Sequence, residues 1–127
     1  ATQTELEAAS ATNVYSSPGR QHFHPSAAKC WVEFTIAGTV TASYNITSVT
    51  DTAVGTWTVN IATDMSSATY SAGASMPPLD SSGTAATFGV RAKGAGTFVI
   101  HSKLCTAGTG NDPDTDPINA WAFGDQA

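Results

Sequence analysis

The stretch SYNITSVTDTAVGTWTVNIATDMSSATYS, residues 43–71, decides the fold class of this chain. Within it, Trp57, Val59 and Ile61 alternate with threonine and asparagine, which is the period-two pattern of a strand with one buried face. Gly55 is a turn signal directly before that strand, and the surrounding valines and threonines favour extended backbone. The stretch therefore predicts a turn at Gly55 that leads into a strand over residues 57–61.

The same alternation continues on both sides of this stretch. Strand patterns run through residues 28–36, 40–46, 57–61, 70–76, 88–92, 98–104 and 118–123. Glycines separate these segments at near-regular spacing, with turns expected at Gly55, Gly73, Gly83 and Gly94-Ala95-Gly96. Short strands at such spacing are typical of a sandwich or barrel, and we predict an all-β fold, a small antiparallel β-sandwich.

The N-terminal residues differ from this β region. Residues 2–11 predict a short helix, because threonine and glutamate recur there with capping-box spacing. Pro18 and Pro25 break the helical pattern, so residues 12–27 predict an extended connector. We therefore divide the chain into residues 1–27, an N-terminal helix with a stalk-like extended connector, and residues 28–127, a β-sandwich head domain.

Composition excludes two classes of partner. Only 12% of the 127 residues are charged, the net charge is −5, and the five basic residues are scattered. Binding to nucleic acid needs clustered lysine and arginine, so we expect no nucleic acid as a partner. No apolar run approaches the roughly 18 residues of a spanning helix, so we expect no membrane insertion. The first residue, Ala1, leaves a processed chain and a fragment as the two interpretations of this terminus.

His22 and His24 are the candidate metal ligands. In an extended segment, side chains at i and i+2 share one face, so three copies around an axis would gather several imidazoles. The competing interpretation is that both histidines pack at the connector or face solvent. We favour the second interpretation and predict no bound metal ion.

A carboxylate-rich segment, Asp112, Asp114 and Asp116, alternates as in the start of a calcium loop. Pro117 and Phe123 stand where that loop needs glycine and a bidentate glutamate, so the calcium pattern fails. We expect a solvated turn here.

The sequence also contains no catalytic motif. It has no nucleophile elbow, no His-Glu-x-x-His and no glycine-rich phosphate loop. Glu33 and Asp51 are two carboxylates in the first half of the β region, and we expect both to be solvated rather than paired for glycoside hydrolysis. We therefore predict that the protein is not an enzyme and that it has no catalytic residues and no cofactor.

The two cysteines form a disulfide candidate. Cys30 begins the first strand of the head and Cys105 ends a late one. A bridge between them would contribute roughly 4 kcal/mol by constraining the unfolded chain. Against it, Cys105 has the strand parity of Val99 and His101 rather than that of Phe98 and Ile100, unless a bulge intervenes. Both a disulfide and two free thiols remain open.

Several segments resemble one known family. They are ATQTELEA with Tyr15, SPGRQ, HPSAAK leading into WVEF, the set Asn45, Ser48, Asp51, Gly55, Trp57, Met65, Ala68 and Tyr70, and the closing INAWAFGD. Together they are similar to the junction and C-terminal head domains of bacteriophage tail-fibre proteins. Cys30 and Cys105 are not part of that pattern.

The resemblance implies a viral structural protein of the extracellular phage particle. It implies a homotrimer that contacts other virion proteins and attaches to a host surface receptor, glycan or protein. The alternative is a purely structural virion component, a head-decorating fibre or tail adaptor tip, which binds another virion protein. Expected receptor contacts are Trp121, Asp112 and Asp114, and any of the large aromatic residues of the head that lie exposed: Trp31, Tyr44, Trp57, Tyr70 and Trp121.

A physical argument also favours the trimer. Leu6 is the only large apolar residue of the predicted helix at residues 2–11. Burying one leucine stabilises by about 1.5–3 kcal/mol, whereas ordering ten residues costs several times as much. Association of three helices around an axis would share that cost with the contacts between the heads.

Overall fold

The computed structural model describes residues 17–24, 26–77, 86–104 and 116–127, together with residues 2, 4, 8 and 15. Its elements are the 3-10 helix η1 (Pro18–Phe23) and the strands β1 (Ala28–Phe34), β2 (Val40–Tyr44), β3 (Ile46–Ala53), β4 (Thr56–Ile61), β5 (Ser71–Ser75), β6 (Ala86–Lys93), β7 (Thr97–Leu104) and β8 (Ile118–Phe123).

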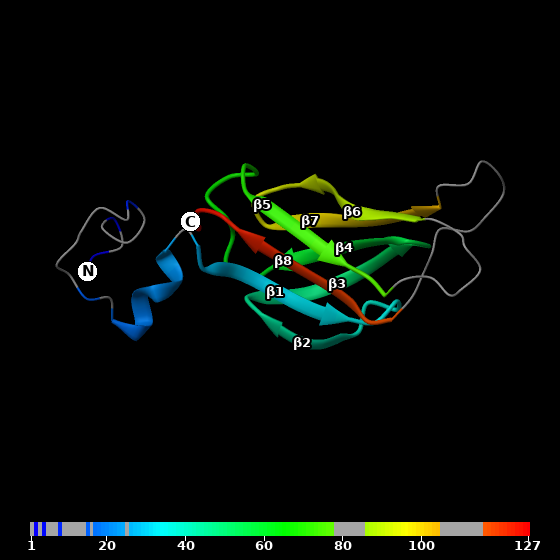
Figure 1. The fold of residues 1–127 in the computed structure, drawn as a ribbon, viewed down its shortest axis with the longest axis horizontal. Helices are drawn as coiled ribbons and strands as arrows, with labels where there is room; N and C mark the ends of the chain where they lie inside the picture. Colours follow the sequence, from blue (N-terminus) through cyan, green and yellow to red (C-terminus); the bar gives the residue numbers. More distant parts are fainter. Residues whose placement is uncertain are drawn as a thin grey trace.

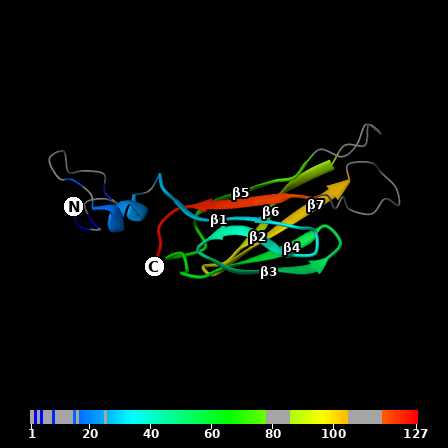
Figure 2. The same cartoon turned by 90° about the horizontal axis from the view of Figure 1, so that it is seen from below.

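The strands form two antiparallel four-stranded sheets, packed face to face (Figures 1 and 2). The first sheet has the order β2-β1-β8-β5, and the second has the order β3-β4-β7-β6. The predicted all-β sandwich is therefore confirmed. In the first sheet, the β1 and β8 segments come from opposite ends of the head and pair along almost their whole length.

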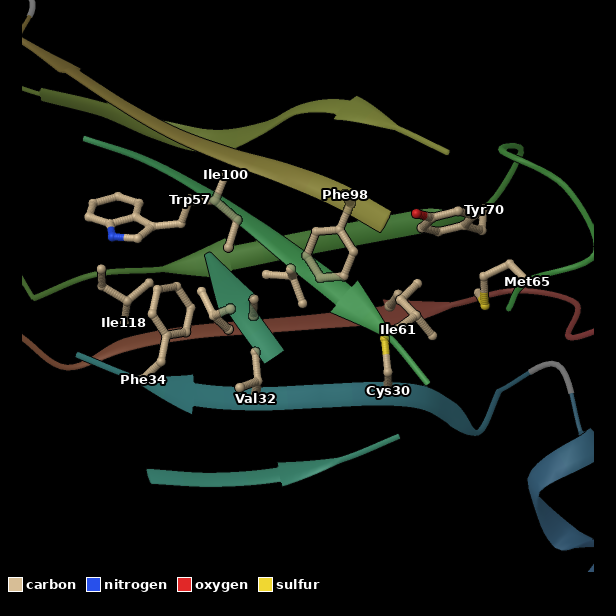
Figure 3. Close-up of a cluster of buried hydrophobic side chains, with 14 residues drawn as sticks. Cys30, Val32, Phe34, Trp57, Ile61, Met65, Tyr70, Phe98, Ile100 and Ile118 are labelled. Atoms are coloured by element: carbon tan, nitrogen blue, oxygen red, sulfur yellow. The ribbon is translucent and has the colours of Figure 1, made fainter. Parts of the chain in front are cut away.

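The core lies between the sheets (Figure 3). It is built from inward-facing residues at alternate positions of β1, β3, β4, β7 and β8, together with Met65 and Tyr70 from the segment between β4 and β5. Its members are Cys30, Val32, Phe34, Val49, Trp57, Val59, Ile61, Met65, Tyr70, Phe98, Ile100, Ile118, Ala120 and Ala122. The two buried aromatic side chains that carry polar groups have partners for them. Trp57 Nε1 donates to the carbonyl oxygen of Ile36 at 2.8 Å, and the Tyr70 hydroxyl lies 2.9 Å from the carbonyl oxygen of Gly94. These bonds remove the cost of burying an unpaired donor.

Asn45 interrupts the single strand that the sequence predicts over residues 40–46. Its φ of 54° is left-handed, and the chain passes there from β2 in the first sheet to β3 in the second. The Asn45 side-chain amide donates to the carbonyl oxygens of Lys29 (3.0 Å) and Thr63 (3.2 Å), and its Oδ1 accepts from the Thr63 backbone N–H (2.8 Å). Asparagine tolerates this conformation better than other residues with a side chain, and here its amide joins three segments.

Two further predictions are wrong. Residues 47–53 belong to β3, although no strand is predicted there. The prediction missed this strand because Val49 is its one buried residue, so the alternation of apolar and polar residues is weak. A turn is predicted at Gly73, yet this glycine lies in the middle of β5, opposite Trp121 of β8. The expected turns at Gly55 and around Gly94–Gly96 do connect strands, while Gly83 lies outside the described residues.

The connector also differs from the extended segment that the sequence predicts. Pro18 begins η1, since its fixed φ suits the first position of a helix. Of the helix predicted over residues 2–11, the structure describes Thr2, Thr4 and Ala8; Thr4 and Ala8 are helical, and the rest lies outside the described residues. In the part of the chain that the structure describes, no helix has the length and apolar content to span a membrane.

Lys29 ties the connector to the head. Its side chain is fully buried at the start of β1, and its ammonium group donates to the carbonyl oxygens of His22 and His24. A buried ammonium group needs such acceptors, because an unpaired charge in the interior is costly. This contact holds the end of η1 beside the end of the sandwich where β1 begins (Figure 1).

The Asn45 crossover leads to a stability prediction. Asn45→Gly removes the amide hydrogen bonds but accepts the left-handed backbone, whereas Asn45→Ala removes the bonds and adds strain. We expect both variants to be destabilised, and the alanine variant to be less stable than the glycine variant by about 1 kcal/mol. Urea denaturation with an unchanged m-value measures the difference.

The matched control is Asn60→Ala. The Asn60 amide donates to Ser48 Oγ (3.0 Å) and Thr50 Oγ1 (3.3 Å), both in exposed positions. We expect that variant to lose less free energy of unfolding than either change at Asn45. Equal stability of the alanine and glycine variants at Asn45 would show that the left-handed backbone is not a constraint.

Candidate functional site

Three aromatic side chains form a row across the outer face of the first sheet. The register places Trp31 of β1 directly opposite Tyr44 of β2 on one side and Trp121 of β8 on the other. Tyr44 is 45% exposed, Trp31 43% and Trp121 36%. We call Tyr44, Trp31 and Trp121 the aromatic row.

The strand period explains why these residues point outward. Trp31 lies between Cys30 and Val32, which are both buried in the core. Trp121 likewise lies between the buried residues Ala120 and Ala122. Successive side chains of a strand point to opposite faces, so each tryptophan must face away from the core. The sandwich does not use the aromatic row as core, and its rings remain available for a partner.

Gly73 determines how the indole of Trp121 lies. The register places Gly73 of β5 opposite Trp121, and a Cβ added to this glycine would lie 2.9 Å from each of the indole atoms Nε1, Cε2 and Cζ2. A point equally distant from these three atoms lies out of the plane of the indole, beside the edge that Nε1, Cε2 and Cζ2 form. This edge of the Trp121 ring therefore packs closely against the backbone of Gly73.

A polar row runs beside the aromatic row on the same face. It consists of Glu33, Asn119 and Ser75, which the register places opposite one another across β1, β8 and β5, and Ala42 of β2 lies at its end opposite Glu33. Glu33 and Asn119 are both half-buried. Glu33 and Lys29 are the two charged residues in these four strands. Because Lys29 is buried under the connector, Glu33 is the charge that these strands present on the outer face.

The structure does not place the other predicted site residues in this site. Asp112 and Asp114 lie outside the described residues. Asp116 Oδ1 accepts a hydrogen bond from the backbone N–H of Ile36 at 2.5 Å and so fastens the start of the last strand segment to the turn after β1. Of the aromatic residues predicted as receptor contacts if exposed, Trp31, Tyr44 and Trp121 lie on an exposed face, while Trp57 and Tyr70 belong to the core.

His22 and His24 do not share the face that an extended connector would give them. His22 lies within η1, with its ring 4.0 Å from that of Phe23, and His24 ends the helix. The Nδ1 atom of His24 is 2.6 Å from Ser26 Oγ and accepts a hydrogen bond from the Ser26 backbone N–H. The geometric premise of the metal interpretation is therefore wrong, since a 3-10 turn replaces the extended segment. Among the residues that the structure describes, no three His, Cys, Asp or Glu side chains gather as metal ligands.

The two carboxylates weighed for catalysis belong to different sheets: Glu33 lies on β1 and Asp51 on β3. The second sheet carries a shallow hollow of about 270 Å³ over β6 and β7. It is lined by Thr87, Phe88, Gly89, Val90, Arg91 and His101. No side chain of the aromatic row belongs to this lining, so the hollow is a separate feature.

Cys30 is a fully buried free thiol, while Cys105 lies outside the described residues. Burial raises the pKa of the Cys30 thiol to about 11, although a hydrogen bond with the backbone of Ala122 acts in the opposite direction. A bond between Cys30 and Cys105 stays a prediction.

The chain was compared with models of protein families, with curated proteins and with solved structures, and none matches it. The resemblance to tail-fibre heads thus depends on the residues quoted above. The structure gives many of them a role in the fold: Asn45 holds the crossover, Gly55 has a φ of 69° in the turn before β4, and Trp57, Met65 and Tyr70 are buried. Two residues of the aromatic row also belong to the quoted segments, Trp31 in WVEF and Trp121 in INAWAFGD.

Gly73 provides a direct test of the site geometry. We expect Gly73→Ala to displace the indole of Trp121, because the new Cβ would lie far inside van der Waals distance of three ring atoms. The signals of the three tryptophan indole N–H groups in a ¹H–¹⁵N NMR spectrum measure this. The Trp121 signal should shift, and the signal of buried Trp57 should remain.

Gly89→Ala is the matched control, because Gly89 lies on strand β6 of the other sheet with open space around an added Cβ. This variant should leave all three indole signals in place. An unchanged Trp121 signal in Gly73→Ala would contradict the close packing of the indole on Gly73.

The pKa of Cys30 predicts its reactivity. In a Cys105→Ser variant at pH 8, about 0.1% of Cys30 would be thiolate, and the thiol is buried as well. We expect no reaction with Ellman's reagent in the folded protein and one equivalent after unfolding in urea. Fast labelling of the folded variant would contradict this burial. The mass of the unaltered chain without reductant shows separately whether Cys30 and Cys105 are bonded.

Proposed function

We propose that this chain is a non-enzymatic attachment module of a bacteriophage virion, the distal domain of a tail-fibre-like protein. In this proposal, the aromatic row is the surface that contacts the host. The observation that carries it is the row itself: Tyr44, Trp31 and Trp121 side by side and exposed on the outer face of one sheet. The virion setting is supported by the sequence resemblance described above.

The fold does not require aromatic residues at these positions. Any polar or β-branched residue satisfies a strand position that faces solvent, as the serine and threonine side chains of β3 do. Neighbouring exposed aromatic rings keep apolar area in contact with water, and contiguous patches of this kind mark interaction sites. A binding role accounts for two tryptophans and a tyrosine in one register row.

The proposal includes a homotrimer. Three copies would present three aromatic rows on one particle tip, and contacts that are individually weak would then gain from avidity toward a repetitive surface. The connector supports such an arrangement, because Lys29 fastens the end of η1 to the head and so transmits the orientation of a stalk.

The test is binding of the fluorescently labelled protein to a panel of bacterial strains, measured by flow cytometry. We expect saturable binding to some strains and not to others. Trp31→Ala and Trp121→Ala should each reduce that binding at least tenfold, since tryptophan dominates the energy of many interfaces. Val54→Ala, at an exposed apolar residue away from the row, is the control and should bind normally.

Two results would contradict the proposal. Absence of binding to every strain would favour the alternative role, in which the chain contacts another virion protein. Binding that is unchanged in both tryptophan variants would move the attachment surface elsewhere on the head. Sedimentation velocity of the same samples checks the trimer, and a well-folded monomer at micromolar concentration would contradict that part.

A further inference from the structure

We infer that the ligand of the aromatic row is an uncharged glycan, bound with its sugar rings stacked on Trp31 and Trp121 and its hydroxyl groups bonded by Glu33 and Asn119. This inference rests on the proposed attachment function and names the chemistry of the receptor. It is argued from five features: the exposed indole of Trp121 beside Gly73, the neighbouring polar row, the length of the aromatic row, the charge of the outer face, and the exposed area of the row.

The exposure of Trp121 suits stacking. An edge of its indole packs against Gly73, and the residue is 36% exposed, so part of the ring is accessible to a flat partner. A pyranose ring has an apolar face of C–H groups, which carry partial positive charge, and the face of an aromatic ring is the negative part of its quadrupole. A platform of this kind fits a sugar ring better than a side chain that must enter a pocket.

The polar row supplies the hydrogen bonds that a sugar needs. Glu33 and Asn119 face each other across β1 and β8, directly beside Trp31 and Trp121 in the strand direction. Two residues along a strand span about 7 Å, so a ring that stacks on the aromatic row brings its hydroxyl groups to the polar row. The carboxylate of Glu33 accepts from hydroxyl groups, and the amide of Asn119 both donates and accepts.

The row is also long enough for a chain of sugars. Tyr44, Trp31 and Trp121 occupy three neighbouring strands, and two strand spacings amount to about 10 Å. A glycan that crosses the strands at right angles would pass over all three rings. Gly73, at the end of the row, adds no side chain that would obstruct it.

Charge decides between neutral and acidic glycans. Glu33 is the charge that the four strands present on this face, and the ammonium group of Lys29 is occupied beneath the connector by the carbonyl oxygens of His22 and His24. The chain as a whole carries a net charge of −5. A polyanionic glycan would meet this carboxylate, and the strands β1, β2, β5 and β8 present no cation on the outer face that would compensate it, so the face suits a neutral polymer.

Area decides between a glycan and a protein partner. The three side chains of the row, at 36–45% exposure, offer roughly 200–300 Å² of surface. A stable protein–protein interface needs about 800 Å² from each partner. The row is therefore small for a protein partner but comparable with the face of a short run of sugar rings.

The experiment uses the surface polysaccharide of a strain that the protein binds. The extract is separated by anion exchange into an uncharged and an anionic fraction, and each fraction competes with cells for the labelled full-length chain. We expect the uncharged fraction to displace the protein and to shift its tryptophan emission. Binding of this fraction, measured by calorimetry, should be at least tenfold weaker in Trp31→Ala and in Trp121→Ala.

Four further variants sharpen the result. Glu33→Gln replaces one acceptor oxygen by an amide NH2 group and removes the charge that strengthens the hydrogen bonds, so it should weaken binding of the uncharged fraction severalfold. Gly73→Ala should weaken binding because it moves the indole, whereas Gly89→Ala should not. Arg91→Ala tests the hollow on the other sheet and should have no effect.

The outcomes separate this inference from the proposed function. If cells bind through Trp31 and Trp121 but neither fraction competes, the receptor is a protein and the glycan inference is wrong while attachment stands. If only the anionic fraction competes, or if Arg91→Ala abolishes binding, the uncharged ligand is wrong. If no strain binds at all, the proposed attachment function itself fails.

Discussion

The pairing of β1 with β8 is the contact on which both the core and the candidate site depend. It joins residues near the start of the head to the last strand of the chain. Its inner face contributes six buried residues: Cys30, Val32, Phe34, Ile118, Ala120 and Ala122. Its outer face places Trp31 opposite Trp121. A slip of one residue in either strand would expose the apolar set and bury the tryptophans, so the energy that holds the core also holds the site in register.

The segments that carry the family resemblance contain residues with two different physical tasks. Asn45, Trp57, Met65 and Tyr70 make contacts between segments that are far apart in sequence, so they specify the sandwich. The exposed rings of the aromatic row contribute little to that specification. A scaffold of this kind allows the chemistry of the outer face to change without loss of the fold, because strand parity separates the two sets of side chains. In other proteins too, a rigid scaffold positions binding residues that can vary without loss of the fold.

Much of the site was accessible to sequence reasoning, but its assembly was not. The positions of Trp31 and Trp121 between small or apolar neighbours predict that both face outward if their strands pack on a core. The alternation of apolar and polar residues does not give the order of the strands in the sheet. It therefore cannot show that Trp31 and Trp121, which are separated by nearly the whole head, lie on neighbouring strands. Gly73 shows the same limit: a glycine between serines and alanines reads as a turn, and only its neighbour across the sheet shows that it makes room for an indole.

The sequence by itself determined the all-β class and the inward or outward direction of most strand residues, because these depend on the local period of the chain. The tertiary structure decided which strands are neighbours, where the chain changes sheets at Asn45, and how η1 replaces an extended connector above Lys29. These features follow from contacts between residues distant in sequence, whose free energies are realised only when the sheets pack. The aromatic row belongs to the second group, since three outward rings become one surface only through the register of β2, β1 and β8.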